Sequence, residues 1–187
     1  LATRGPVCVI AGAGTGKTRA ITHRIAYAAS IGTMDPQKVL ALTFTARAAG
    51  EMRARLRTLG VPTVAARTVH SAALKQLLFF WPTVFGGRTP DLITSKGSFL
   101  AESVRRAGLT SSISLQNRDL MRDIATEIEW AKVSQVAPED FIDEISKRLI
   151  KPRVNPEQLV QLYTAYESIK KQELAIDFED VLLLTDR

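Results

Sequence analysis

The chain has 187 residues, of which 45% are hydrophobic and 24% are charged. This is the composition of a soluble globular protein with one large domain or two small ones. No apolar run approaches the roughly 20 residues of a membrane span, and no charged-then-apolar leader is present, so we expect no membrane partner and a cytoplasmic protein. The single cysteine, Cys8, excludes an internal disulfide, and we expect it to be a small core residue.

The net charge of +6 is unevenly distributed. Residues 1–75 contain 11 Lys and Arg against 2 Asp and Glu, a balance of +9, whereas residues 76–187 contain 14 against 17, a balance of −3. A basic first part favours phosphate-rich partners, nucleic acid above all. The alternative is a basic surface that only keeps the protein soluble.

Residues 7–19 read VCVIAGAGTGKTR. The four apolar residues 7–10 predict a short strand buried on both faces. A glycine-rich turn and Lys17-Thr18 follow, and residues 19–29 have apolar residues at helical spacing. Strand, glycine-rich turn, GKT and helix together are the context of a phosphate-binding P-loop.

The residue types explain how such a loop would bind a nucleoside triphosphate. Small residues let the backbone approach the phosphates, successive N–H groups form an anion-binding nest, and the helix directs its positive end at the phosphates. Lys17 would reach the β- and γ-phosphates, and the Thr18 hydroxyl would bind Mg²⁺, so both have catalytic roles. The expected phosphate-binding residues are Ala11, Gly12, Ala13, Gly14, Thr15, Gly16, Lys17 and Thr18. Ala11 stands where the strict pattern has Gly, so the backbone there must not need a left-handed conformation.

Two further strand–helix units follow in residues 39–80. Residues 39–44 (VLALTF) predict a strand, and Thr45 is a natural N-cap for a helix over residues 46–59. Residues 64–69 predict a third strand, followed by a helix over residues 71–80. Three such units predict a parallel sheet with right-handed crossovers, and open α/β sheets bind ligands at the carboxyl edge of their strands.

From Trp81 onward the pattern predicts helices only, over residues 95–107, 117–133, 138–149 and 156–173. Trp81 and Trp130 are expected to be core anchors of this helical block. Asp177 is interpreted as the cap of a last short helix over residues 178–185, with Asp180 at its third position. No His/Cys cluster has metal-ligand spacing, so the only expected metal is nucleotide-bound Mg²⁺.

Four segments resemble, in order and spacing, the motifs of the UvrD/Rep/PcrA group of superfamily-I DNA helicases. AGAGTGKTRAITHRIAY is similar to motif I, LALTFTARAAGEMRARL to motif Ia, and TVHSAALKQL to motif Ib. IDFEDVLLLT resembles the segment that returns the chain to the first motor domain. The resemblance covers essentially the whole chain.

This resemblance implies the N-terminal, ATP-binding part of an ATP-dependent 3′-to-5′ helicase that translocates on single-stranded DNA in repair or replication. It implies a RecA-like P-loop motor domain, 1A, in residues 1–80 and 176–187, with an inserted helical subdomain, 1B, in residues 81–175 that would approach the duplex junction. ATP and Mg²⁺ would be the cofactors, with Arg19 on the adenine side. The implied DNA-binding residues are Thr43, Phe44, Thr45, Arg47, Thr68, His70 and Ser71, with Phe44 against a base.

Some positions depart from the family pattern. Ala46 and Arg47 stand where Asn and Lys are usual, and Val69 replaces the Phe of TFHS, which leaves no ring there to stack. Without the resemblance, Phe44 at a strand end would be a core residue and His70 an ordinary surface histidine.

Two other functions remain open: a small P-loop kinase acting on a metabolite, and a non-enzymatic nucleotide- or DNA-binding module. We expect the chain alone to be an incomplete motor. No apolar strand ending in Asp-Glu follows the loop, and the resemblance implies that a second RecA-like domain completes the site. A sheet edge should therefore be exposed or covered by a partner.

Overall fold

Two short parallel strands organise the first part of the chain in the computed structural model, which describes residues 5–12 and 14–186. The chain divides into two compact units, Leu1–Ala73 and Leu74–Arg187, and each is described by itself. In the first unit, β1 (Leu40–Thr43) pairs in parallel with β2 (Ala65–Thr68), in a register that sets Leu40 opposite Ala65 and Thr43 opposite Thr68.

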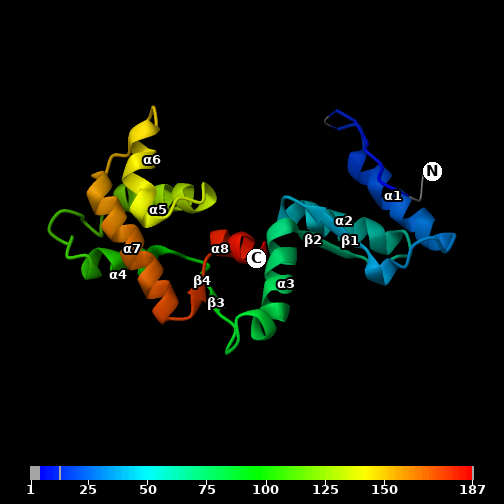
Figure 1. Cartoon of the computed structure of the whole chain (residues 1–187). Helices are drawn as coiled ribbons and strands as arrows, with labels where there is room; N and C mark the ends of the chain where they lie inside the picture. Colours follow the sequence, from blue (N-terminus) through cyan, green and yellow to red (C-terminus); the bar gives the residue numbers. More distant parts are fainter. Residues whose placement is uncertain (1–4, 13, 187) are drawn as a thin grey trace. The chain divides into compact units, whose positions relative to one another are not determined.

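Helix α2 (Ala46–Thr58) connects these strands and packs against both of them (Figure 1). It begins where predicted, because the Thr45 hydroxyl accepts a hydrogen bond of 3.2 Å from the Ala48 N–H. Helix α1 (Lys17–Ser30) packs against α2, and a one-turn 3₁₀ helix, η1 (Pro36–Lys38), leads into β1. The apolar core of this unit consists of Ile25, Ala41, Met52, Leu56, Val61, Val64 and Ala66.

The stretch before the glycine-rich turn differs from the prediction. Residues 7–10 form no strand, and Ile10 is 96% exposed. Cys8, expected in the core, is also exposed. A strand exists only where a neighbour accepts its backbone hydrogen bonds, and no described residue pairs with this stretch. The part of this unit that the structure describes therefore has two paired strands instead of three.

The boundary between the units falls inside α3 (Val69–Val84), which is longer than the predicted helix because it continues through Pro82. After α3, the second unit contains β3 (Asp91–Leu92), α4 (Gly97–Arg106), α5 (Arg118–Val133) and η2 (Pro138–Asp140). It continues with α6 (Phe141–Lys147), α7 (Pro156–Gln172), β4 (Ala175–Ile176) and α8 (Phe178–Thr185).

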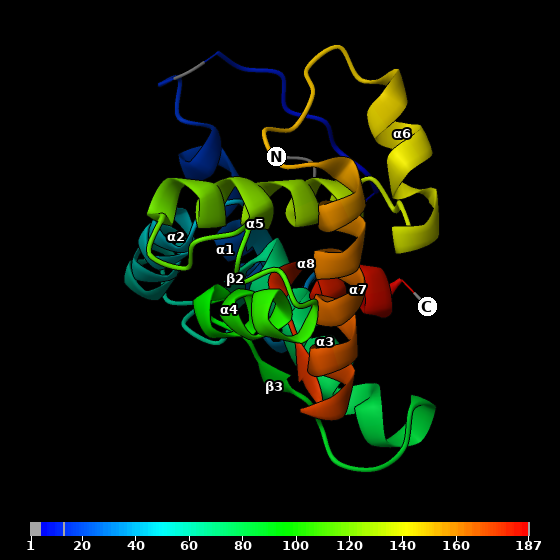
Figure 2. The same ribbon diagram turned by 90° about the vertical axis from the view of Figure 1, so that its left-hand side faces the viewer.

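Helix α7 is the central element of the second unit and packs against α4, α5 and α6 (Figure 2). Its buried stripe, Leu159, Leu162, Tyr163 and Tyr166, lies in the core with Phe141 and Ile128. Trp130 packs against this core beside Phe141, as predicted. Trp81 is buried as predicted, but it stacks on Phe85 and does not belong to this core cluster.

Two details of this unit correct the prediction. The helix expected over residues 138–149 is a 3₁₀ turn followed by α6, which ends at Lys147. The block is also not purely helical, because β3 and β4 form a short parallel pair that sets Asp91 opposite Ala175. Strands of two residues have too little periodicity to be recognised in a sequence.

The predicted α/β fold is thus confirmed in its coarse form: a mixed structure, mostly helical, with short parallel strands. The finer RecA-like arrangement and the division into residues 1–80, 81–175 and 176–187 remain predictions. Among the described residues, no helix is both long and apolar enough to cross a membrane.

Candidate nucleotide and nucleic-acid sites

The glycine-rich turn has a backbone that requires glycine at two positions. Gly14 and Gly16 have φ angles of 76° and 93°, in the left-handed region that side chains other than glycine rarely adopt. Gly16 is also the N-cap of α1. The predicted loop therefore exists as a turn directly before a helix; Ala13, one of its predicted phosphate-binding residues, lies outside the described residues.

Lys17 turns back over this loop. Its ammonium Nζ donates to the carbonyl oxygens of Ala11 at 3.1 Å and Gly12 at 2.5 Å. The Thr15 hydroxyl donates to the same Gly12 carbonyl at 2.8 Å. The described part of the loop thus holds an exposed ammonium group beside a glycine-rich turn, which is what a phosphate-binding lysine needs.

The first turn of α1 is suited to an anion. Its N-cap, Gly16, has no side chain to accept a hydrogen bond from the helix N–H groups, and the first turn contains no acidic residue. The backbone N–H groups and the helix dipole therefore point toward the loop without a competing carboxylate. These features fit the phosphates of a nucleotide.

Thr18 and Arg19 follow in this first turn. Thr18 is half-buried and Arg19 is exposed. The buried Thr22 hydroxyl donates to both of their carbonyl oxygens at 3.0 Å, which anchors the turn. The Thr18 hydroxyl is the kind of hard oxygen ligand that Mg²⁺ prefers, so the residues present fit a nucleotide with its metal ion.

The two segments expected to bind DNA meet at one edge of the sheet. Thr43 and Thr68 are the last residues of β1 and β2, and they lie opposite each other in the register. The segments 43–45 and 68–71 are therefore neighbours, although more than 20 positions separate them in the chain. The carboxyl ends of parallel strands are the edge at which such sheets bind ligands.

Local hydrogen bonds hold both segments. The Thr43 hydroxyl donates to the Thr45 carbonyl at 3.1 Å. The Thr68 hydroxyl accepts from the Ser71 N–H at 3.1 Å, and the Ser71 hydroxyl donates to the Thr68 carbonyl at 3.1 Å. These polar side chains therefore fix the turns that lead from each strand into its helix.

Phe44 lies between two of these anchored threonines and is 96% exposed. A core role is excluded by this exposure. An exposed ring on a fixed turn has the properties that base stacking requires, because a freely mobile ring would lose more entropy on binding. His70 and Arg47 are also exposed, and Arg47 pairs with Glu51 at 3.3 Å on the surface of α2.

Sequence reasoning missed a buried charge cluster in the second unit. Lys132 of α5 and Lys170 of α7 both contact Asp177 and Asp180, the two residues of the α8 capping box. Asp177, Lys132 and Lys170 are buried. A signal existed, because Lys132 and Lys170 continue the apolar stripes that include Ile128 and Tyr166, four positions before each.

The charges of this cluster stabilise one another. Burial alone would disfavour the ionised Asp177, but Lys132 and Lys170 outweigh it and hold the Asp177 pKa well below its ordinary value. Burial likewise disfavours the charged Lys132, yet Asp177, Glu167 and Asp180 raise its pKa. Burial raises the pKa of the nearby Tyr163 to about 12.

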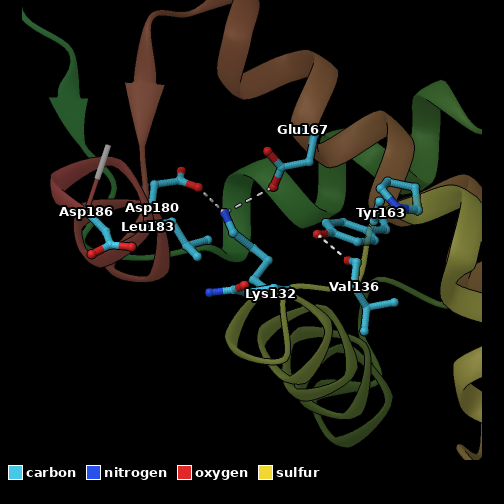
Figure 3. A pocket seen from close by; sticks show the side chains of 10 residues that line it. Lys132, Val136, Tyr163, Glu167, Asp180, Leu183 and Asp186 are labelled. Carbon is cyan, nitrogen blue, oxygen red and sulfur yellow. Dashed lines mark hydrogen bonds and ion pairs between the residues drawn. The ribbon is translucent and has the colours of Figure 1, made fainter.

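A cleft of about 460 Å³ opens beside this cluster, with Lys132, Tyr163, Glu167 and Asp180 in its wall (Figure 3). Oxygens of Glu167, Asp177 and Asp180 lie within 4.8 Å of one another, close enough to share a metal ion. In this structure the three carboxylates pair with the ammonium groups of Lys132 and Lys170 instead, so the opposite charges of the cluster neutralise one another.

Comparison with known proteins places these features in a family. The family described as UvrD/REP helicase N-terminal domain matches residues 1–187. The chain is 44% identical to the ATP-dependent DNA helicase UvrD2 of Mycobacterium tuberculosis, over 99% of this chain and 27% of that protein. It is 32% identical to the ATP-dependent DNA helicase PcrA of Leuconostoc citreum, over 98% of this chain and 24% of that protein.

The chain is also 30% identical to the PcrA of Bacillus subtilis, over 98% of this chain and 24% of that protein. It spans about a quarter of the length of these relatives. The family match extends over residues 1–187. It agrees with the structure, in which Lys17 contacts its glycine-rich turn and the two motif segments meet at one edge of the sheet. The chain therefore belongs to the UvrD/REP helicase family as its N-terminal domain.

Proposed function

We propose that this chain is the ATP-binding N-terminal part of a DNA helicase that moves along single-stranded DNA. The observation that carries the proposal is the composition of one compact unit, which combines a glycine loop around Lys17 with an exposed Phe44 on an anchored strand end. The names of the relatives, ATP-dependent DNA helicases, support it.

In this proposal, residues 11–18 hold the phosphates and Arg19 lies on the adenine side. Mg²⁺ bound through Thr18 would supply charge for the transferring phosphoryl group. The Lys17 ammonium and the N–H groups of the first turn of α1 would bind the phosphate oxygens. Lys17 would leave its two carbonyl partners for a phosphate, a stronger acceptor because it is charged.

On the DNA side, Phe44 would stack on a base, and the threonine and serine hydroxyls would bind the backbone. The DNA-binding residues would be Thr43, Phe44, Thr45, Arg47, Thr68, His70 and Ser71. None of these groups reads a base edge in this proposal, so binding would depend little on DNA sequence.

We propose further that residues 1–80 and 176–187 belong to a RecA-like motor domain, 1A, and that residues 81–175 form the inserted helical subdomain, 1B. The 1B subdomain would approach the duplex junction, and movement would run 3′ to 5′ in repair or replication, as the resemblance implies. The partners would be single-stranded DNA and the rest of the helicase chain, including the acidic metal-binding strand and a second RecA-like domain.

ATP turnover by the full-length protein tests the proposal. Single-stranded DNA should stimulate hydrolysis, and the stimulation should disappear in Lys17→Ala. Stimulation by a nucleoside or a sugar, with none by DNA, would instead establish a small-molecule kinase. Nucleotide and DNA binding with no turnover under any condition would establish a non-enzymatic binding module.

A further inference from the structure

The segment Asp177–Asp180, which opens α8, contains three carboxylates, and each pairs with a lysine from another element of the second unit. The Lys132 ammonium lies 2.7 Å from Asp177 and 2.5 Å from Asp180. Lys170 lies 3.0 Å and 2.6 Å from the same two groups. Lys96, just before α4, bridges Glu179 at 2.8 Å and Glu129 of α5 at 2.7 Å.

These contacts attach α8 to α5, α7 and the start of α4. Figure 3 shows the Lys132 side chain from α5 between Glu167 of α7 and Asp180 of α8. The Tyr166 hydroxyl adds a hydrogen bond of 3.2 Å to Asp177. One short helix is thus held by three separate parts of the helical block.

The backbone reinforces this attachment. The strands that enter and leave the helical block, β3 and β4, pair with each other: the Asp91 N–H donates to the Leu174 carbonyl at 2.9 Å, and the Ile93 N–H donates to the Ile176 carbonyl at 2.8 Å. The next residue after this pair is Asp177. The paired strands and the charge cluster therefore form one continuous connection.

Buried ion pairs contribute little net stability compared with an apolar core of the same shape. What they impose is geometry, because a buried carboxylate without its lysine is strongly unfavourable. Asp177 is completely buried and has two lysine partners, so a position of α8 that separated Asp177 from both lysines would be unfavourable.

We propose that Lys132 and Lys170 are positioning residues that make α8 and the helical block one rigid joint. The inference rests on the proposed function, in which α8 belongs to the motor domain. A movement of α8 during the ATP cycle would then carry the helical block with it, and so couple hydrolysis to opening of the duplex. Neither lysine touches nucleotide or DNA in this proposal.

The test compares Lys132→Met with wild type in the full-length protein. Methionine keeps the length and apolar stem of lysine but leaves Asp177 with one cation fewer. DNA-stimulated ATP turnover should stay within about twofold of wild type, while the rate of duplex unwinding falls by about tenfold or more, because only the coupling is lost. Lys132→Arg, which keeps the charge, should recover part of the unwinding rate.

Lys147→Met is the matched control. Lys147 is an exposed lysine of the same helical block, paired with Glu144 on the surface, and its loss should change neither activity. If ATP turnover and unwinding fall together in Lys132→Met, in proportion to the folded fraction, the cluster is only structural and the proposal of a rigid joint is wrong. The joint is also wrong if unwinding is unchanged.

Amide hydrogen exchange separates this inference from the proposed function. In wild type, α8 should be protected to the same degree as α5 and α7. In Lys132→Met, the amides of α8 should exchange at least about tenfold faster, while those of α5 and α7 keep their protection. Retained protection of α8 would overturn the joint even if the protein proved to have no helicase activity.

Discussion

Lys17 is the residue on which the nucleotide site depends. Within residues 5–12 and 14–186, the hydrogen bonds of its ammonium go to the loop carbonyls of Ala11 and Gly12, and the side chain is exposed, so it contributes to the loop and not to the core. The GKT motif indicated this lysine in the sequence, and the structure adds that its ammonium lies against the loop carbonyls. Its removal should therefore affect chemistry without affecting folding.

We expect Lys17→Ala in the full-length protein to lower DNA-stimulated ATP turnover by at least about 100-fold, because the charge on the transferring phosphoryl group loses its nearest cation. Steady-state hydrolysis and thermal melting measure the two effects. Lys38→Ala is the control, since Lys38 is exposed and pairs only weakly with Asp35. Normal turnover in a folded Lys17→Ala protein would falsify the nucleotide site.

Phe44 gives the second prediction at the scale of single residues. Because its ring is exposed, Phe44→Ala should leave thermal stability unchanged but weaken binding of single-stranded DNA by roughly 1–3 kcal/mol, independently of sequence. Fluorescence anisotropy with labelled oligonucleotides of different sequence measures this loss. Phe79→Ala, at another exposed phenylalanine, is the control. A fall in melting temperature with unchanged DNA affinity would contradict the stacking role.

Among the elements, α8 is the helix that depends most clearly on charged side chains, both for its cap and for its contacts. It spans only Phe178–Thr185, and a helix this short is not stable alone in water. The sequence predicted its cap, Asp177, and the third position, Asp180, and the structure confirms a complete capping box. The lysines that neutralise those carboxylates come from α5 and α7, far away in the sequence.

This charge cluster predicts how stability changes in acid. The groups that lie near the Asp177 carboxylate are Lys132, Lys170, Tyr166, Asp180 and Glu167. The Asp177 pKa is lower in the folded than in the unfolded state, so its contribution to stability is complete above the ordinary carboxyl pKa of 3.8. That contribution is lost as the pH falls below this value toward the lower folded pKa.

Thermal melts followed by circular dichroism between pH 7 and pH 2 measure this effect. The melting temperature should fall below about pH 4 in wild type. Asp177→Asn should melt at a lower temperature at pH 7 and should have a flatter pH dependence below pH 4. If the melting temperature of Asp177→Asn fell below pH 4 as steeply as that of wild type, other carboxylates would determine the acid sensitivity.

At the scale of the whole molecule, the distribution of acidic residues predicts what the chain can do alone. The unit that contains the loop has two acidic residues, Asp35 and Glu51. Asp35 caps η1 and pairs with Lys38, and Glu51 pairs with Arg47. Hydrolysis of a nucleotide needs a carboxylate that holds Mg²⁺ and orients water, and both of these are engaged elsewhere.

We therefore expect residues 1–187, expressed alone, to bind ATP without turning it over. Equilibrium binding of a fluorescent ATP analogue and a steady-state hydrolysis assay give the two readouts. Lys17→Ala in the same fragment controls for binding at the loop. Turnover that rises with added single-stranded DNA and is absent from the Lys17→Ala fragment would contradict this expectation.

The sequence alone determined the features that depend on neighbouring residues. The loop and GKT before α1, the Thr45 cap of α2 and the Asp177 cap of α8 are formed by residues a few positions apart. Hydrogen bonds of this kind are local, so the chain order is sufficient to predict them.

The tertiary structure decided the features that depend on partners far along the chain. Residues 7–10 have the composition of a strand, but none of the residues that the structure describes pairs with them. Strands β3 and β4 exist only because two distant dipeptides meet. In the same way, Lys132 and Lys170 meet at Asp177 only in the folded chain. Pairing and burial are properties of the assembled chain, because the free energy of a strand or a buried charge is set by what lies against it.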